Sequence, residues 1–346
     1  MTMKKLVKNP VFPVAAVSLS CRTRSLSNKT RAQLSPSPKT SGNESGRLRL
    51  FSPSKVNLFL RVVRRREDGY HDLASLFHVI DLGDTMTFEA LPDGATKDIL
   101  TCDMEGVPTD GSNLVIKAFD LYRQKTGEER YYRVHLEKTV PHGAGLGGGS
   151  ANAATALFAA NRLGDGKATE SDLLDWSGAI GSDISVFFSE GAAYCTGRGE
   201  IVEDVEPPLP LDLPILLVKP PVGLSTPQIF KALDLERRSS ADPLELLQGL
   251  ASGRSCTPEL CVNDLEQPAF DTLPELLHLK ERLASEGNFS TVFMTGSGST
   301  IVCVGSDEAP AFLREDPRYR DVFVAPTRLI TRSRGEWYEP VLPRRA

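Results

Sequence analysis

A run of glycines near the middle of the chain restricts the fold more than any other feature. Five of the seven residues from 143 to 149 are glycine. Glycine loses more conformational freedom on folding than any other residue, so the run is costly unless the backbone needs positive φ angles or close approach to a ligand. The run leads directly into SANAATALFAANRL, residues 150–163, whose Ala and Leu content predicts a helix. The N–H groups at the start of that helix would face the loop, which predicts an anion site for nucleotide phosphates.

Three other interpretations of the glycine run fit the sequence less well. A flexible linker rarely runs straight into a strong helix. A Walker loop requires Gly-Lys-Ser or Gly-Lys-Thr, and no lysine directly follows these glycines. A dinucleotide-binding fingerprint follows a fully apolar strand, whereas the residues before this loop alternate in polarity as His135, Leu136, Glu137 and Lys138.

Apolar patterns elsewhere predict a mixture of strands and helices. A half-buried strand is expected where Leu48, Leu50 and then the residues from Val56 to Val62 alternate. Two further apolar segments follow at 73–82 and 85–91. Strands are expected at 131–138, 215–218, 291–294 and 301–304. Helices are expected at 113–126, 172–180, 228–235, 244–250, 274–286 and 308–315. The order lacks a regular βαβ alternation, which favours two α+β domains. Closely spaced prolines from 207 to 214 divide them into 47–210 and 211–346.

Residues 1–46 differ in composition from the rest of the chain. They carry eight Lys or Arg, eight Ser and a single acidic residue, which predicts a disordered organelle transit peptide, although another kind of disordered basic tail fits as well. The remaining residues hold 32 of the 40 basic and 44 of the 45 acidic side chains, a net charge near −12. That charge argues against nucleic acid or an anionic membrane as a partner. No apolar run is long enough to span a bilayer.

Three blocks of sequence together resemble the GHMP kinases, a superfamily of ATP-dependent small-molecule kinases. The blocks are PHGAGLGGGSANAA at 141–154, PSKVNLFL at 53–60 and FMTGSGSTIVC at 293–303. One family within the superfamily is matched more closely, the 4-diphosphocytidyl-2-C-methyl-D-erythritol kinases of the non-mevalonate isoprenoid pathway. The segments that resemble it are 52–84, which includes GYHDL, together with GSDISVFF at 181–188 and STPQIFKAL at 225–233. The resemblance covers 47–335, with its blocks in the same order.

The resemblance implies a fold and a location. The expected fold has a ribosomal-protein-S5-like N-terminal domain that binds ATP and a ferredoxin-like α/β C-terminal domain, with the active site in the cleft between them. A plastid location, in the chloroplast stroma, is also implied and is consistent with the basic leader. Both a monomer and a homodimer stay open.

The same resemblance implies phosphorylation of the 2-hydroxyl of the cytidylyl methylerythritol substrate by ATP. Lys55 and Asp183 match the catalytic pair: a carboxylate can orient the alcohol and accept its proton, and a lysine can keep that carboxylate ionised and stabilise charge on the phosphoryl group. Taken alone, Asp183 also fits a helix N-cap, and Lys55 a solvated strand lysine. Asn57 lies on the same strand face as Lys55 and is expected to bind the substrate.

The remaining site residues are also carried over from the resemblance. Tyr70 and Phe230 match the aromatic pair that sandwiches the cytosine, and His71 the residue that bonds its edge, although Phe230 alone fits a core helix position. Gly296, Ser297 and Gly298 are expected to close over the substrate. The residues expected around the ATP phosphates are Pro141, Gly143, Gly145, Leu146, Gly147, Gly148, Gly149, Ser150 and Asn152.

The expected cofactors are ATP and Mg²⁺. No acidic cluster with metal spacing is visible, so Mg²⁺ should be held mainly by ATP phosphates and water, with Ser150 as a candidate ligand.

Two competing functions remain at this stage. The first is another GHMP kinase, of the homoserine or mevalonate type, which would lack Gly69-Tyr70-His71 and the segment 226–230. The second is a catalytically silent nucleotide-binding GHMP protein, which would lack the pair formed by Lys55 and Asp183. RNA-binding domains share part of this fold, but the acidic charge disfavours that role.

Overall fold

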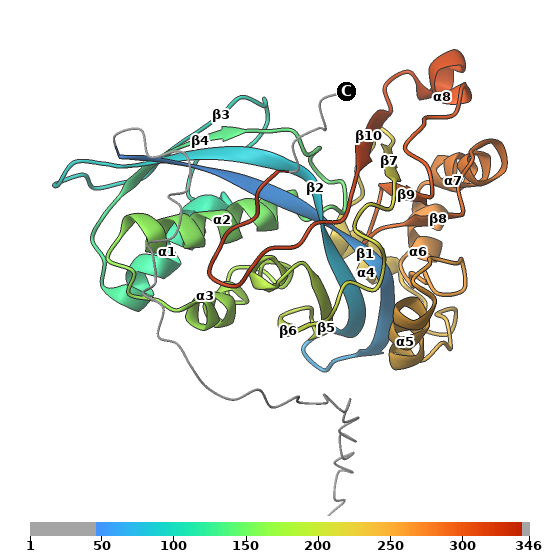
Figure 1. The fold of residues 1–346 in the computed structure, drawn as a ribbon, viewed down its shortest axis with the longest axis horizontal. Helices are drawn as coiled ribbons and strands as arrows, with labels where there is room; N and C mark the ends of the chain where they lie inside the picture. Colours follow the sequence, from blue (N-terminus) through green and yellow to red (C-terminus); the bar gives the residue numbers. More distant parts are fainter. Residues whose placement is uncertain (1–45, 341–346) are drawn as a thin grey trace, which may run out of the picture. The chain divides into compact units, whose positions relative to one another are not determined.

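The computed structural model describes residues 46–340, which belong to one compact unit of the chain. They form two sheets and the helices that cover them, which confirms the α+β class (Figure 1). The predicted transit peptide at 1–46 lies outside the described residues, apart from Gly46. Within the described range, no helix is both long enough and apolar enough to cross a membrane.

The first sheet is organised around a long antiparallel hairpin formed by β1 and β2 (Figure 1). The opposite edge of β2 pairs with β4 near one end and with β5 near the other. β3 extends the sheet beside β4 in parallel, and β6 extends it beside β5. The strands are β1 (Arg47–Arg65), β2 (His71–Ala90), β3 (Ile99–Cys102), β4 (Tyr132–Glu137), β5 (Ala192–Gly197) and β6 (Ile201–Asp204).

Three helices and a short 3-10 helix belong to this sheet: α1 (Leu114–Thr126), α2 (Gly148–Leu163), α3 (Glu170–Ser177) and η1 (Ser185–Phe188). Asn113 caps α1 by accepting from the Val115 N–H at 2.9 Å. The small side chains of α2 allow close packing, and nine of its residues are buried. Phe88, Phe119 and Tyr132 join α1 and α2 to the sheet in one aromatic core. Because the glycine run leads directly into α2, the packing of α2 on the sheet also fixes the position of the glycine run.

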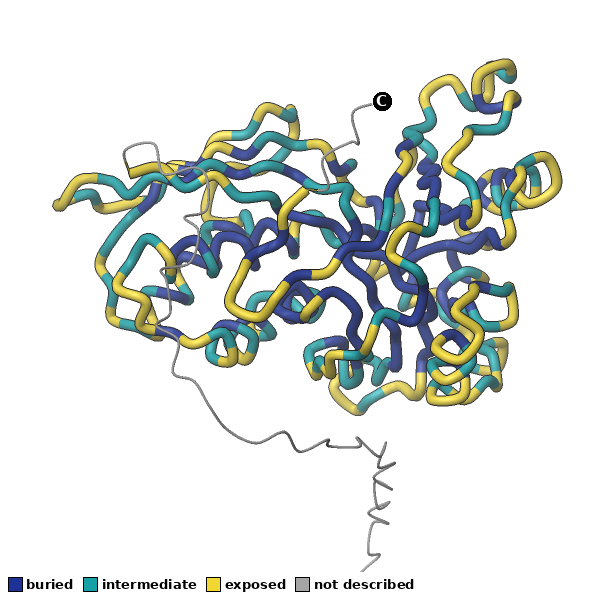
Figure 2. Tube along the Cα trace, viewed as in Figure 1, coloured by how far each residue is buried: buried dark blue, intermediate teal, exposed yellow. Residues whose placement is uncertain are grey.

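The burial of β1 differs from the prediction of a half-buried strand. Every residue from 52 to 62 is buried, and Figure 2 shows this stretch within a continuous buried region. Val56 and Leu58 belong to a cluster that includes Leu217 of the second sheet. The polar side chains that alternate with them, Lys55 and Asn57, are also buried, on the other face of the strand.

The second sheet is antiparallel throughout, with the order β10-β7-β9-β8. Its strands are β7 (Ile215–Lys219), β8 (Thr291–Met294), β9 (Ile301–Val304) and β10 (Phe323–Thr327). Its helices are α4 (Thr226–Ala232), α5 (Pro243–Gly253), α6 (Glu266–Thr272), α7 (Pro274–Glu286), α8 (Phe312–Glu315) and the 3-10 helix η2 (Pro317–Tyr319). Helices follow the first and third strands, which gives the ferredoxin-like order and confirms that expectation. We propose the domain boundary at 210/211, between the last strand of the first sheet and β7.

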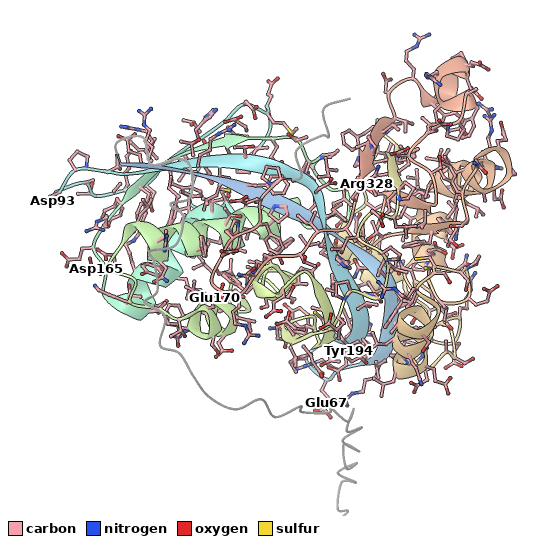
Figure 3. All side chains as sticks on the ribbon, viewed as in Figure 1. Glu67, Asp93, Asp165, Glu170, Tyr194 and Arg328 are labelled. Carbon is pink, nitrogen blue, oxygen red and sulfur yellow. The ribbon has the colours of Figure 1, made fainter. Side chains whose placement is uncertain are left out.

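The segment after β10 returns to the first sheet, as the red trace in Figure 1 shows. The backbone N–H of Ile330 donates to Val79 of β2 at 3.0 Å, and the Trp337 ring lies 4.6 Å from that of Phe158 in α2. Arg332 is almost fully buried and donates to Glu170 of α3 at 2.5 Å, a residue labelled in Figure 3. The end of the described chain therefore anchors the domain that carries the glycine run.

Candidate active site

A cleft of about 1190 Å³ collects nearly all the predicted site residues. It is lined by β1, the β1–β2 turn, the glycine run, the segment before η1, α4 and the loop between β8 and β9. Gly298 is the one predicted residue that does not line it. Residues remote in sequence are thus placed around one volume, which is large enough for two small-molecule ligands.

The glycine run forms a backbone cradle that suits an anion. Gly143, Gly145 and Gly147 have φ angles of +63°, +75° and +70°, a region that other residues rarely adopt. The helix begins two residues earlier than predicted, at Gly148, and Gly147 is its N-cap without any side-chain cap. The backbone N–H groups of Gly148, Gly149 and Ser150 have no acceptor among residues 46–340. Three unsatisfied donors and the positive end of the helix dipole therefore face the cleft.

The cradle rests directly on the second glycine loop, between β8 and β9. A Cβ atom on Gly145 would lie 2.7 Å from the carbonyl oxygen of Thr295 and 2.9 Å from that of Gly298. The Thr300 hydroxyl donates to the Ala144 carbonyl at 2.6 Å. Gly298 thus lies behind the cradle, while Gly296 and Ser297 line the cleft. The two loops fix each other through backbone contacts that only glycine permits.

Lys55 is 2% exposed and lies between the cradle and Asp183. Its ammonium donates to the Gly145 carbonyl at 2.9 Å and to Asn57 Oδ1 at 2.7 Å, and its Nζ is 3.7 Å from Asp183 Oδ2. Burial lowers the pKa of Lys55, and the nearby Asp183 carboxylate opposes that shift. The interpretation of Lys55 as a solvated strand lysine was wrong, because its side chain is enclosed by Phe77 of β2, Gly147 of the glycine run and Gly296 of the loop between β8 and β9.

Asp183 has Lys55 as the only ion-pair partner of its carboxylate among residues 46–340. Its side chain is 40% exposed to the cleft, and it accepts no hydrogen bond from a described residue. The alternative that it caps a helix is wrong, since Ile184 is the N-cap of η1 and no side chain caps that helix. Asp183 Oδ2 can therefore face Lys55 while the other carboxylate oxygen stays accessible to a substrate hydroxyl.

Asn57 holds Lys55 in place through its amide oxygen. Its Nδ2 donates to Ser75 Oγ at 2.8 Å, and its backbone N–H donates to Thr295 Oγ1 at 2.8 Å. The residue lines the cleft as predicted, but these bonds occupy the amide oxygen and one amide hydrogen. Its position is that of a residue that orients Lys55, with one amide hydrogen left for a ligand.

The predicted aromatic residues line the same cleft as the cradle. Tyr70 is 57% exposed, and Phe230 on α4 is partly buried against the core of the second sheet. The His71 ring stacks on Phe230, with 5.3 Å between centroids. Burial and the positive charge of Arg65 lower the pKa of His71, which favours a neutral imidazole at pH 7. His71 and Phe230 thus lie together, and Tyr70 lines the same cleft, so Phe230 is not solely a core residue.

Sequence reasoning missed the buried Asp84, which ties the cradle to the sheet. Its Oδ1 accepts from the backbone N–H groups of Thr139 and Val140 at 2.8 and 2.9 Å. Its Oδ2 accepts from Lys138 Nζ at 2.5 Å and from Asn152 Nδ2 at 2.9 Å. The amide nitrogen of Asn152 is thus held inside the protein. The break between the predicted segments 73–82 and 85–91 was the available signal, since a charged residue there interrupts two apolar runs.

The donor set suits Mg²⁺ only in combination with a nucleotide. Among residues 46–340 no group of three or more His, Cys, Asp or Glu is placed to hold a metal ion. The Ser150 side chain makes no hydrogen bond to a described residue and lies at the first turn of α2, where it lines the cleft. A hydroxyl oxygen beside a phosphate cradle is the kind of hard ligand that Mg²⁺ accepts alongside phosphate oxygens and water.

The chain is similar to known proteins in sequence and in fold. Residues 113–191 match the GHMP kinases N terminal domain. The chain is 55% identical over 295 residues to the 4-diphosphocytidyl-2-C-methyl-D-erythritol kinase, chloroplastic, of Arabidopsis thaliana, covering 85% of this chain and 76% of that protein. It is 46% identical over 291 residues to the 4-diphosphocytidyl-2-C-methyl-D-erythritol kinase of Protochlamydia amoebophila, covering 84% and 93%. A crystal structure of 4-(cytidine 5'-diphospho)-2C-methyl-D-erythritol kinase aligns with a TM-score of 0.64 at 31% identity, over 81% of this chain and 99% of that one.

Proposed function

The chain belongs to the 4-diphosphocytidyl-2-C-methyl-D-erythritol kinase family, and we propose that it transfers the γ-phosphoryl group of ATP to the 2-hydroxyl of 4-diphosphocytidyl-2-C-methyl-D-erythritol. One observation carries the proposal: Lys55 and Asp183 lie 3.7 Å apart in the same cleft as the phosphate cradle and the predicted aromatic residues. A catalytically silent nucleotide-binding protein would have no need of this pair. The plant relatives are named as chloroplastic, and the protein is a plastid enzyme.

The cradle binds the phosphates of ATP. The free N–H groups of Gly148, Gly149 and Ser150 supply three donors, and the α2 dipole adds favourable potential for negative charge. Next to them, Leu114 reaches within 3.9 Å of the position of a Cβ on Gly149. Together with Val107 and Pro108 it forms an apolar part of the cleft that fits the faces of an adenine ring.

Lys55 and Asp183 act on the reacting groups. Two of the three ammonium hydrogens of Lys55 are held by Gly145 and Asn57, which leaves the third for the side of Asp183 and the transferring phosphoryl group. Asp183 orients the tertiary alcohol and receives its proton as the bond from oxygen to the γ-phosphorus forms. The bond from that phosphorus to the bridging oxygen breaks, and ADP leaves. Lys55 and the cradle N–H groups stabilise the charge that spreads over the phosphoryl oxygens.

Mg²⁺ bound with ATP would be held by phosphate oxygens and the Ser150 hydroxyl. When bound, it neutralises phosphate charge. The chain itself positions the reacting groups. The cradle orients the nucleotide, and Asn57 orients Lys55.

The acceptor is recognised through its cytosine base. Tyr70 and Phe230 offer aromatic faces for stacking, and His71 offers a neutral imidazole for the base edge. Because His71 already lies against one face of Phe230, a stacked base takes the opposite face or displaces the imidazole. The stacking supplies affinity, and hydrogen bonds to the base edge supply discrimination.

The test is ATP consumption by the full chain in a coupled assay with Mg²⁺. The cytidylyl methylerythritol substrate should support turnover, whereas mevalonate and homoserine should not. Turnover with mevalonate or homoserine alone would show a different GHMP kinase. Tight ATP binding without turnover on any of the three would show a silent nucleotide-binding protein.

A further inference from the structure

The tight turn between β5 and β6 reaches into the cleft beside the catalytic carboxylate. Its residues Gly197 and Gly199 have φ angles of +69° and +116°, and they flank Arg198. A Cβ atom on Gly199 would lie 3.3 Å from Asp183 Oδ1, so the turn packs against Asp183. Arg198 itself lines the cleft together with Tyr70 and Asp183. No motif had pointed to this turn, because its only sequence signal is a pair of glycines.

The guanidinium of Arg198 is held at one end and free at the other. Its Nε lies 3.4 Å from Glu200 Oε1, and its Cζ lies 5.3 Å from the centroid of the Tyr70 ring. The Arg198 backbone N–H also donates to Glu200, at 2.6 Å. Its two terminal nitrogens have no acceptor within residues 46–340, and the side chain is 33% exposed. The contacts with Glu200 and Tyr70 therefore orient a planar set of donors without using them up.

We propose that Arg198 binds the diphosphate of the acceptor and so selects acceptors that carry one. The inference rests on the proposed function, in which the base lies near Tyr70 and the reacting hydroxyl near Asp183. Arg198 contacts the Tyr70 ring and belongs to the turn that packs on Asp183, so it lies where the linking diphosphate must pass.

Charge makes a cation necessary at this place. The Asp183 carboxylate lines the cleft beside the path of the diphosphate, and its repulsion of the phosphates must be offset. Lys55 is committed to the reacting groups, and Lys138 forms a buried pair with Asp84. Arg65 and Lys231 also line the cleft, but Arg198 is the cation that contacts the Tyr70 ring and belongs to the turn packed on Asp183. Arg198 lines the same region with free donors, and the planar guanidinium matches two phosphate oxygens at once.

The test compares ligands that share the base and differ in the phosphates. Calorimetry measures binding of CDP and of cytidine to the full chain, with the nucleotide site filled by the ATP analogue AMP-PNP and Mg²⁺. The wild-type protein should bind CDP about tenfold or more tightly than cytidine, the size expected for a charge-assisted contact. Arg198→Ala should lose about tenfold in CDP affinity and change cytidine affinity by less than about twofold. Arg198→Lys should retain part of the preference, because it keeps the charge but not the planar fork.

Kinetics provides a second readout and a matched control. Arg198→Ala should raise the KM of the diphosphate acceptor about tenfold, with kcat within about threefold and the KM of ATP unchanged. Arg64→Ala is the control, because Arg64 is an ion-paired arginine of the β1–β2 region that does not line the cleft. It should leave the preference for CDP intact.

Two results would overturn the inference while leaving the proposed function standing. In the first, Arg198→Ala weakens CDP and cytidine equally, which would mean that Arg198 only braces Tyr70. In the second, neither affinity changes. If the wild-type protein binds neither CDP nor cytidine, the proposed function itself fails, and the inference fails with it.

Discussion

Gly145→Ala tests how the two glycine loops hold the catalytic lysine. Gly145 has a φ of +75°, and an alanine Cβ there would lie 2.7 Å from the Thr295 carbonyl oxygen. An L-residue in this region costs about 1–2 kcal/mol. Overpacking against backbone atoms that cannot rotate away adds about 1–3 kcal/mol. Together these are a large part of a typical unfolding free energy of about 5–15 kcal/mol.

The change also acts on catalysis, because the Gly145 carbonyl accepts from Lys55 at 2.9 Å. Pushing the two loops apart moves that carbonyl, so kcat should fall together with stability. Denaturant unfolding measures the stability of the full chain, and the coupled kinase assay measures kcat. The expected loss of stability is about 2–5 kcal/mol, the sum of the strain and the overpacking.

The matched control for stability is Gly143→Ala. Gly143 has a similar φ of +63°, but the nearest atom to its Cβ position is Gly223 Cα at 3.8 Å. Gly143→Ala should therefore lower the free energy of unfolding only by the cost of the positive φ angle, about 1–2 kcal/mol. Equal losses of stability in the two variants would refute the claim that the second glycine loop requires glycine at Gly145.

Four further predictions concern charged groups of the site. Asp183→Asn should lower kcat by about 10²- to 10⁴-fold and leave calorimetric AMP-PNP affinity within about threefold; equal losses of both would indicate misfolding instead. The same variant should lower the pKa of Lys55 further, since Asp183 is what opposes the effect of burial, and NMR of labelled lysine would contradict this by showing a rise. In the wild-type protein, burial already lowers the pKa of Lys55. The wild-type kcat should therefore fall as pH rises through the pKa of Lys55, because the ammonium form is lost. Asp84→Asn removes the counter-ion of the buried Lys138 and should cost about 3–5 kcal/mol in urea unfolding, whereas the exposed Asp93 (Figure 3) gives a control variant that should change stability little.

Local sequence patterns predicted several elements whose own residues show a clear helix or strand pattern. The helix at 274–286 and the strands at 291–294 and 301–304 have the predicted bounds. The cradle belongs to this class only in part: the glycines and the alanine-rich helix predicted its backbone locally, whereas its contact with the loop between β8 and β9 is visible only in the structure. The strands β3, β5, β6 and β10 were missed.

From the amino-acid sequence alone came the prediction of a glycine loop that leads into a helix N-terminus, and the family resemblance named Lys55 and Asp183. Only the tertiary structure shows that Lys55 is buried, because Phe77, Gly147 and Gly296, all distant from it in sequence, close around its side chain. It also brings Asp84 to Lys138, Arg198 to Tyr70, and Trp337 to Phe51, 286 residues away in sequence. Periodic patterns report which face of an element avoids water, but they carry no record of which distant element covers that face. For this reason the anion site could be predicted locally, while the surroundings that set its charges could not.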